Sequence, residues 1–175
     1  MIPTVDSTTR LLPATADRSP YRAQMDEIRA VFVESAPHRE RRALIFEALD
    51  LYARLIWSYW PHARLWINGG FVTHKESAPH DVDVVFLVPS SDFSRVLLSE
   101  GDSLGLMTFL NVSADQPNIT APRVQPFGGL IDSFFCPSDI PIAVETWRDR
   151  WSMASTVDGS GYRSDIEKGF LEVTQ

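Results

Sequence analysis

Residues 81–88 (Asp-Val-Asp-Val-Val-Phe-Leu-Val) constrain the fold of this chain more than any other segment. From Val84 onward every one of them is apolar, and most are β-branched or aromatic, which favours a strand over a helix. A strand without an alternating polar side exposes apolar side chains to water on any face that is left uncovered. The segment therefore predicts a strand in a sheet that is covered on both faces.

Hydrophobic spacing predicts the other elements. Apolar residues recur at three- and four-residue steps over residues 39–60, which predicts a long amphipathic helix that Pro61 ends. Further helices are expected at residues 23–33, after the turn at 89–92 to about residue 98, and at 143–153; further strands at 64–68, 130–136 and 169–173; and loops at 113–126 and 158–161. Residues 104–112 fit either a helix or a strand. This order predicts a mixed α/β domain.

The first 20 residues differ from the rest of the chain. They are polar, carry three prolines and show no periodic apolar pattern, so we expect an arm that is laid on the domain or left loose. Residues 21–175 are expected to form a single domain.

Charge and cysteine content exclude several functional classes. Acidic residues outnumber basic ones by 23 to 16, and the net charge of −7 excludes a generally basic coat for nucleic acid or a membrane surface. The single cysteine, Cys136, excludes a disulfide framework and a cysteine-based zinc site. No apolar run approaches the ~20 residues of a membrane helix, so we expect a cytoplasmic protein without a membrane partner.

Asp81 and Asp83 are the first candidates for chemistry. Two residues apart in a strand, their side chains share one face, with Cα atoms ~6.5–7 Å apart. Such carboxylates can converge on Mg²⁺, which proteins usually bind through a few carboxylates and substrate phosphates. A pair of ions ~3.5–4 Å apart can activate a hydroxyl and stabilise a leaving pyrophosphate. The alternative is an acidic pair that merely solvates the end of the strand.

Gly69 and Gly70 directly follow the strand expected at 64–68. Without side chains, glycine backbone N–H groups can approach a phosphate closely, although a diglycine is also common in ordinary turns. The combination of strand, diglycine, loop and Asp-Val-Asp is more specific than any of its parts.

Gly69, Gly70, Asp81 and Asp83 together resemble the signature of the DNA polymerase beta-like nucleotidyltransferase superfamily. That signature is an apolar residue, Gly-Gly or Gly-Ser, a gap of about ten residues, and Asp–apolar–Asp/Glu. More narrowly, Gly-Gly-Phe-Val-Thr-His-Lys and Pro-His-Asp-Val-Asp-Val-Val are similar to a group of small bacterial and phage nucleotidyltransferase-like proteins. Leu-Leu-Pro at 11–13, Phe-Phe-Cys-Pro at 134–137 and Lys-Gly-Phe-Leu-Glu-Val at 168–173 extend this resemblance over most of the chain.

The chain departs from that group at two positions. Gly70 stands where serine is common, which removes a hydroxyl that could contact phosphate, and His74 stands where aspartate is common. The resemblance also implies a third carboxylate on a neighbouring strand, for which Asp132 is the candidate. A charged residue inside an apolar strand is costly unless it is paired or metal-bound, although Asp132 could instead lie on an exposed face.

The resemblance implies the following fold, site and reaction. The fold is the minimal nucleotidyltransferase arrangement, a small mixed, twisted sheet with helices packed mainly on one face. Asp81, Asp83 and Asp132 would bind Mg²⁺, with Mn²⁺ as a substitute, and Asp132 would hold the acceptor-side metal or take the acceptor proton. The triphosphate of an NTP would lie against Gly69, Gly70, Thr73 and Lys75. The reaction is transfer of a nucleoside monophosphate to an acceptor hydroxyl.

The acceptor and two alternatives stay open. The net charge favours a protein, a small molecule or a tRNA end over an extended duplex, and the resemblance suggests a toxin–antitoxin or defence module. One alternative is a catalytically silent protein that keeps the fold to bind a nucleotide or a partner. The other is a metal phosphohydrolase carrying His80-Asp81, but such enzymes place this dipeptide on a helix, whereas Asp81 opens a strand.

Other conspicuous side chains are expected to be structural. Phe71 and Trp66 could stack on a base but fit the core better, and Cys136 is expected to be buried. The cations expected at the surface are Arg39, Arg41 and Arg42 at the start of the long helix, and Arg148, Arg150, Arg163 and Lys168 near the C-terminus. The alternative for the four C-terminal cations is that they supply further positive charge to the site. Lys75, one of only two lysines, is expected to contact phosphate, with a solvated loop lysine as the alternative.

Overall fold

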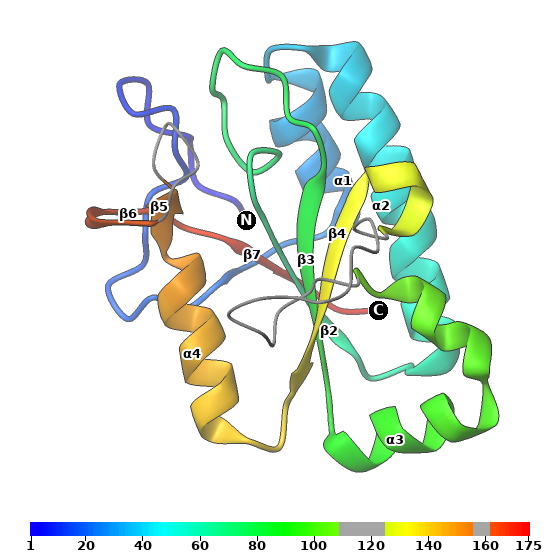
Figure 1. The fold of residues 1–175 in the computed structure, drawn as a ribbon. Coiled ribbons are helices and arrows are strands. Elements are labelled where there is room, and N and C mark those ends of the chain that lie inside the picture. The colour runs from blue at the N-terminus through cyan, green and yellow to red at the C-terminus, as the bar shows by residue number, and fades with distance from the viewer. Residues whose placement is uncertain (109–124, 156–161) are drawn as a thin grey trace, which may run out of the picture.

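The computed structural model describes residues 1–108, 125–155 and 162–175 (Figure 1). Its helices are α1 (Met25–Arg29), α2 (Arg39–Tyr59), α3 (Ser90–Ser99) and α4 (Pro141–Trp151), with short π or 3-10 turns η1 (Ala30–Glu34), η2 (Gly101–Leu106) and η3 (Pro126–Gly129). Its strands are β1 (Tyr21–Arg22), β2 (Arg64–Asn68), β3 (Val82–Val88), β4 (Ile131–Pro137), β5 (Met153–Ser155), β6 (Tyr162–Glu167) and β7 (Leu171–Val173). The predicted α/β class is confirmed.

Five strands form one mixed sheet in the order β1-β7-β2-β3-β4. β3 runs parallel to β4 and antiparallel to β2, while β7 runs antiparallel to β2 and parallel to β1. β5 and β6 pair separately as a small antiparallel ribbon beside the main sheet (Figure 1). The sheet thus joins strands from both ends of the described chain.

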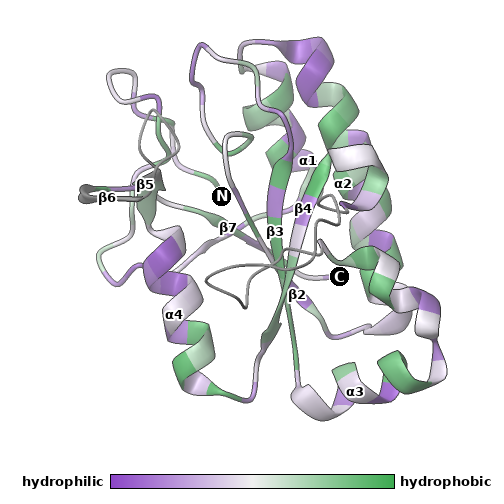
Figure 2. Cartoon of the chain, viewed as in Figure 1, coloured by the Kyte–Doolittle hydropathy of each residue, from purple (hydrophilic) through white to green (hydrophobic). Residues whose placement is uncertain are grey.

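One face of the sheet is covered by α1, α2 and α3, which lie on the same side in Figure 1. The buried stripe of α2 includes Ile45, Leu49, Tyr52 and Ile56, at the three- and four-residue steps that the sequence predicts. These side chains share a core with apolar residues of β2, β3 and β7, and β3 is hydrophobic along most of its length (Figure 2). Most of the described helical residues therefore lie on this face.

The opposite face carries α4 and a smaller aromatic core. Trp66, Phe170 and Trp151 pack there, with the Trp66 and Phe170 ring centroids 5.2 Å apart. β3 is consequently buried on both faces, as predicted, and the helices are mainly on one face with α4 as the exception. Phe71, Trp66 and Cys136 are all buried, in agreement with their expected structural roles.

The N-terminal arm, residues 1–20, packs along the domain. Leu12 is fully buried in the main core, and its carbonyl accepts a hydrogen bond from Gly169 N at 2.7 Å. Leu11 forms an isolated β-bridge with Thr73, and Arg10 O accepts a hydrogen bond from His74 N at 2.9 Å. The arm therefore links the loop after β2 to the segment before β7.

Several local predictions were incomplete. The sequence did not indicate β1, β5 or β6, and it placed Met153 in a helix, whereas Met153 begins β5. α3 starts directly after Pro89. The carboxylate that lies at its first residue comes from a distant part of the sequence: Asp139 Oδ1 accepts hydrogen bonds from Ser90 N at 2.8 Å and Ser90 Oγ at 2.9 Å. The loop expected at 158–161 and most of that expected at 113–126 lie outside the described residues, as do residues 109–112.

None of the helices in the described ranges combines the length and apolar character that a membrane crossing requires.

Candidate functional site

Three polar side chains lie side by side at one end of the sheet. Asn68 pairs with Asp83 across the antiparallel β2–β3 ladder, and Asp83 pairs with Asp132 across the parallel β3–β4 ladder. Val82 and Val84 face the α2 side, so the alternation of strand side chains turns Asp83 to the α4 side. The same alternation turns Asp132 and Asn68 to that side. The register thus forms a row of one amide and two carboxylates on one face.

Asp132 is 5% exposed, so the alternative of a solvated strand face is wrong. Asp83 and Asp81 are half-buried, and Asp81 lies immediately before β3. Because neighbouring strands are ~4.8 Å apart, Asp83 and Asp132 are close enough to act on one ligand. Asp132 comes from the strand beside β3, where the resemblance required the third carboxylate.

Gly69 makes the tight approach between the turn after β2 and Asp83. Its φ of +81° lies in the left-handed region, and a Cβ added there would lie 1.8 Å from Asp83 Oδ2. At Gly70, by contrast, an added Cβ would meet only Pro79, at 3.8 Å, which is ordinary contact. The first glycine is therefore required by geometry, whereas the second position has room for the serine of the resembling proteins.

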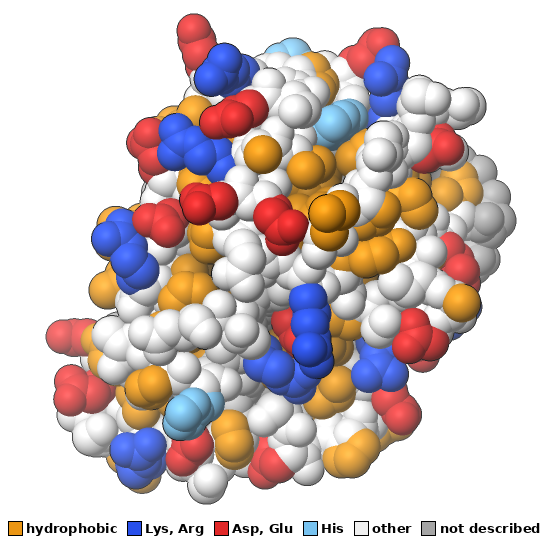
Figure 3. Space-filling view, turned by 180° about the vertical axis from the view of Figure 1, so that it is seen from behind, with side chains coloured by type: hydrophobic (Ala, Val, Ile, Leu, Met, Phe, Trp, Pro, Cys, Tyr) orange, Lys and Arg blue, Asp and Glu red, His pale blue; other side chains and the backbone are white. Residues whose placement is uncertain are grey.

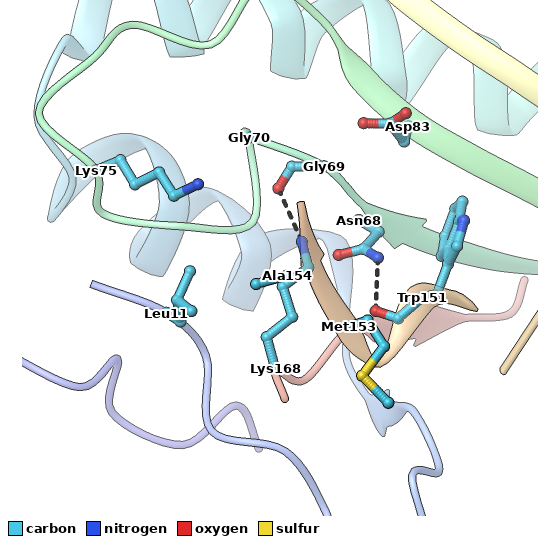
Figure 4. Close-up of a pocket in the computed structure, with 10 residues that line it drawn as sticks. All are labelled: Leu11, Asn68, Gly69, Gly70, Lys75, Asp83, Trp151, Met153, Ala154 and Lys168. Carbon is cyan, nitrogen blue, oxygen red and sulfur yellow. Dashed lines mark hydrogen bonds between the residues drawn. The ribbon is translucent and has the colours of Figure 1, made fainter. Parts of the chain in front are cut away.

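A pocket of about 190 Å³ lies beside this turn and is shown in Figure 4. Its polar lining consists of Asn68, Gly69, Gly70, Lys75, Asp83 and Lys168. Pockets that enclose drug-sized ligands usually measure ~300–1,000 Å³, so this one suits a phosphate-sized group better than a whole nucleotide. A second cavity of about 210 Å³ adjoins it, shares Gly70 and Lys75, and reaches Thr73 and Asp81. Asp132 lines neither cavity.

Lys168 is a pocket residue, and its expected place at the surface was wrong. Lys168 is only 8% exposed, and its Nζ donates a hydrogen bond to Gly69 O at 3.5 Å (Figure 4). Burial lowers the pKa of Lys168 to about 8, with the charge of Asp83 opposing this shift and that of Lys75 adding to it. Lys75 is half-buried in the loop after Gly70 and lines the same pocket.

The hydroxyl of Thr73 is used within the turn. Oγ1 donates to Gly70 O at 2.8 Å and accepts from Lys75 N at 3.4 Å, and the residue is 1% exposed. Thr73 therefore holds the diglycine turn in shape and orients the backbone of Lys75. A direct phosphate contact would require the hydroxyl to leave Gly70.

Two arginines of α2 hold the loop between β2 and β3. Arg42 is fully buried and donates to Phe71 O at 2.7 Å and to Thr73 O at 2.8 Å; burial lowers its pKa to about 10. Arg41 donates to Pro79 O at 3.2 Å and also to His80 O. The prediction of a solvated helix face is therefore wrong for Arg42, whose charge is satisfied by loop carbonyls.

Asn68 is a pocket residue that the sequence analysis did not select. Its Nδ2 donates to Trp151 O at 3.0 Å, while its buried Oδ1 has no hydrogen-bond partner among the described residues. A buried polar atom without a partner is costly, so such an oxygen marks a place for a donor or a cation. The available signal was an amide that ends an apolar strand directly before Gly-Gly.

The other C-terminal cations do not line the pocket. Arg148 is half-buried on α4, and Arg150 lies exposed with its guanidinium over the Trp147 ring at 5.8 Å from the centroid. The side chain of Arg163 lies outside the described part of the chain. Among the described side chains of these four C-terminal cations, Lys168 is therefore the one that lines the pocket.

The donor set fits Mg²⁺ in part. In the ranges that the structure describes, no three His, Cys, Asp or Glu side chains lie close enough together to hold a metal ion. Asp83 and Asp132 nevertheless supply hard carboxylate oxygens from paired positions. Because Mg²⁺ is commonly bound through one or two carboxylates plus substrate phosphates, this pair beside a phosphate-sized pocket suits it.

These features define a class: an α/β domain with a lysine-bearing polar pocket at one end of a mixed sheet. Residues 3–174 match a family described as a family of unknown function, DUF6932, and the chain belongs to that family. No curated protein and no solved structure matches the chain.

Proposed function

We propose that this protein is a Mg²⁺-dependent nucleotidyltransferase that moves a nucleoside monophosphate from an NTP to an acceptor hydroxyl. The observation that carries the proposal is the pairing of Asp83 with Asp132 on adjacent parallel strands, next to a pocket lined by Gly69 and Lys75. Carboxylates for a cation and an ammonium with backbone amides for phosphate are the two parts that this reaction needs. The resemblance described above supports the same reading.

In the proposed reaction the acceptor oxygen bonds to the α-phosphorus, and the bond from that phosphorus to the bridging β-oxygen breaks. Pyrophosphate leaves, and the acceptor proton passes to a carboxylate. Mg²⁺ would be held by Asp83 and Asp132 together with the substrate phosphates, with Asp81 just before the same strand, and it would supply charge neutralisation at the phosphates. Asp132, the most buried of the three, takes the proton or completes the acceptor side of the cation site.

Gly69, Gly70 and Lys75 hold the leaving phosphates in this proposal. The size of the pocket supports a phosphate group inside it, with the nucleoside extending outward. Thr73 acts by holding the turn, through its hydrogen bond to Gly70 O. Because the chemistry depends mainly on positioning and charge, this small set of side chains is sufficient.

The acceptor is proposed to be a protein, a small molecule or a tRNA end. The net charge of −7 opposes the binding of a long duplex, and Figure 3 shows acidic and basic side chains interspersed over the face opposite to that of Figure 1. The reaction would take place in the cytoplasm, where NTPs are supplied. A role in a toxin–antitoxin or defence module rests on the resemblance alone.

A second candidate is a catalytically silent protein that binds a nucleotide. It is favoured by one observation: within the described residues the three aspartates do not form a ready cluster for a metal ion. In that case Asp83 and Asp132 would contribute to binding without turnover.

The deciding experiment uses each of the four NTPs labelled at the α-phosphate, with Mg²⁺ or Mn²⁺, and the protein and RNA fractions of a cell lysate. Wild type is compared with Asp83→Asn and Asp132→Asn, and with Asp50→Asn as a control on α2. Label transferred by wild type and the control only would support the enzyme and name its nucleotide. NTP binding without label in any fraction would favour the silent binder.

A further inference from the structure

The only two lysines of the chain line one pocket. Lys75 comes from the loop after β2, and Lys168 comes from the segment just before β7. We propose that Lys168 is a ligand-binding residue that forms, together with Lys75, a subsite for the polyphosphate chain of a nucleotide. The inference deepens the proposed function and rests on it for the identity of the nucleotide, but the polyphosphate subsite is testable without any transfer reaction.

The Lys168 ammonium is buried with little hydrogen bonding. The residue is 8% exposed, and within the described chain the hydrogen bond of Nζ goes to Gly69 O, at the long distance of 3.5 Å. A buried charge is unfavourable unless it is paired and well hydrogen-bonded. The charge of Asp83 and one long bond to a carbonyl compensate part of that cost, and an anion in the adjoining pocket would compensate more of it.

Lys75 places a second positive charge at the same pocket. It lines the same pocket, and its charge adds to the lowering of the Lys168 pKa, so the two ammonium groups repel one another. Two like charges held at one cavity destabilise the empty state; Asp83 in the same lining offsets part of this repulsion, and an anion that lies between the two lysines relieves more of it. In Figure 4, Lys75 extends from its loop toward the diglycine turn, whose Gly69 carbonyl Lys168 contacts.

Backbone hydrogen bonds hold the segments that carry both lysines in place. His74, next to Lys75, donates its N–H to Arg10 O at 2.9 Å, and Gly169, next to Lys168, donates its N–H to Leu12 O at 2.7 Å. One short segment of the arm thus ties down the neighbours of both lysines. Their separation is set before a ligand arrives, which lowers the entropic cost of binding.

An uncharged group at the same pocket, the side-chain amide of Asn68, also favours a polar ligand. Asn68 Oδ1 is buried at the same pocket without a hydrogen-bond partner among the described residues, and Figure 4 shows its Nδ2 turned away to Trp151 O. Such an oxygen is satisfied by a hydrogen-bond donor, such as a water that bridges it to a bound phosphate group. A hydrated polyphosphate supplies both an anionic chain and such a water, whereas a simple fatty or aromatic ligand supplies neither.

The test measures binding of inorganic tripolyphosphate by calorimetry, without an acceptor. We expect Lys168→Met to weaken binding by about tenfold or more, the size of a lost charge-assisted hydrogen bond, and Lys168→Arg to keep part of it. Arg54→Met, at an exposed cation of α2, is the matched control and should bind as wild type does. Equal affinity for wild type and a folded Lys168→Met, or no binding by wild type, overturns the inference.

A structural role for Lys168 is separated by its effect on folding. The charge of Asp83 and one long hydrogen bond compensate the buried ammonium only in part, so the melting temperature of Lys168→Met should not fall. If that variant fails to fold, the wild-type protein is tested instead. Acetic anhydride labelling followed by peptide mass spectrometry measures the acetylation rates of Lys75 and Lys168 separately. We expect tripolyphosphate to slow acetylation of both, and an unchanged rate at Lys168 overturns the inference.

The outcomes for this subsite and for the proposed reaction are distinct. Tripolyphosphate binding that depends on Lys168, without label transfer by wild type, would support the subsite and remove the transferase. Label transfer that survives Lys168→Met with unchanged KM and kcat would keep the transferase and overturn the subsite.

Discussion

Gly69 and Asp83 are in such close approach that no side chain fits at position 69. A Cβ there would lie 1.8 Å from Asp83 Oδ2 and 2.9 Å from its carboxyl carbon. The turn after β2 and the start of β3 are therefore built as one unit, in which the backbone of the first glycine lies against the carboxylate.

Replacing Gly69 with alanine should accordingly destabilise the protein. The left-handed φ alone costs about 1–2 kcal/mol for an L-residue, and displacement of Asp83 adds to this cost. We expect a loss of more than about 2 kcal/mol in the free energy of unfolding, measured in urea. Gly70→Ala is the matched control, because its Cβ would meet only Pro79 at 3.8 Å, and it should change stability by less than about 0.5 kcal/mol. Equal losses for both would contradict the geometry of the turn.

Arg42→Met should loosen the loop that carries Thr73 and Lys75. The substitution removes four hydrogen bonds to backbone carbonyls, two of them to Phe71 O and Thr73 O in this loop and the others to Phe32 O and Pro37 O. Since each such loss costs about 1–3 kcal/mol, we expect a destabilisation of at least about 2 kcal/mol, with faster amide hydrogen exchange in the loop. Arg39→Met, at an exposed position of the same helix, should leave both measurements unchanged. Slow exchange retained in Arg42→Met would show that other contacts hold the loop.

The affinity for tripolyphosphate should depend on pH through Lys168. Burial lowers the pKa of this lysine to about 8, below its ordinary value of 10.5, so the free protein loses the ammonium charge as the pH rises through about 8. The charged form binds an anion, so affinity should fall as the pH rises above about 8. Lys168→Arg should show a flatter profile to pH 9, because a guanidinium stays protonated there. Superimposable profiles would mean that another group controls binding.

Cys136 should be unreactive in the folded protein. It is fully buried, and burial raises the pKa of its thiol to about 11, with the charge of Arg64 partly opposing this shift. Little thiolate is then present at pH 8, so a thiol reagent such as DTNB should react slowly with native protein and rapidly in denaturant. Because Cys136 is the only cysteine, the reaction reports a single site. Rapid stoichiometric reaction without denaturant would indicate that this side of β4 opens readily.

The main helices and strands could be predicted because each is specified by a pattern within its own contiguous residues. The apolar run of β3 and the periodic stripe of α2 each specify their own structure, and Gly69 and Asp83, both selected from the sequence, lie against one another at one end of the sheet. The adjacency of Asp83 and Asp132 depends on strand order and register, which a resemblance could suggest but no spacing could fix. The strand β5 has only three residues, too few for a distinct pattern, and β6 (Tyr-Arg-Ser-Asp-Ile-Glu) is mostly polar and so lacks an apolar run.

Lys168 and Arg42 show what the sequence could not reveal. Both are long cations in polar surroundings along the chain, and their burial arises from segments far away in sequence. Lys168 lines a pocket together with Leu11 of the arm and Trp151 of α4, and Arg42 donates hydrogen bonds to carbonyls of the loop after β2. Asn68 was overlooked for a related reason, since an orphaned amide oxygen becomes evident only when its surroundings are known.

The position of β7 between β1 and β2 has a consequence for how the chain reaches this structure. β1 joins the sheet only through β7, and the hydrogen bond from Trp66 to Glu172 closes a separation of 106 residues. Such distant pairing loses a large loop-closure entropy before the new contacts stabilise the chain, which makes folding slow. An early folding intermediate built on α2, β2, β3 and β4 would already align the carboxylates, but it would lack Lys168. Ligand binding should therefore mature late in refolding, when the final strand inserts.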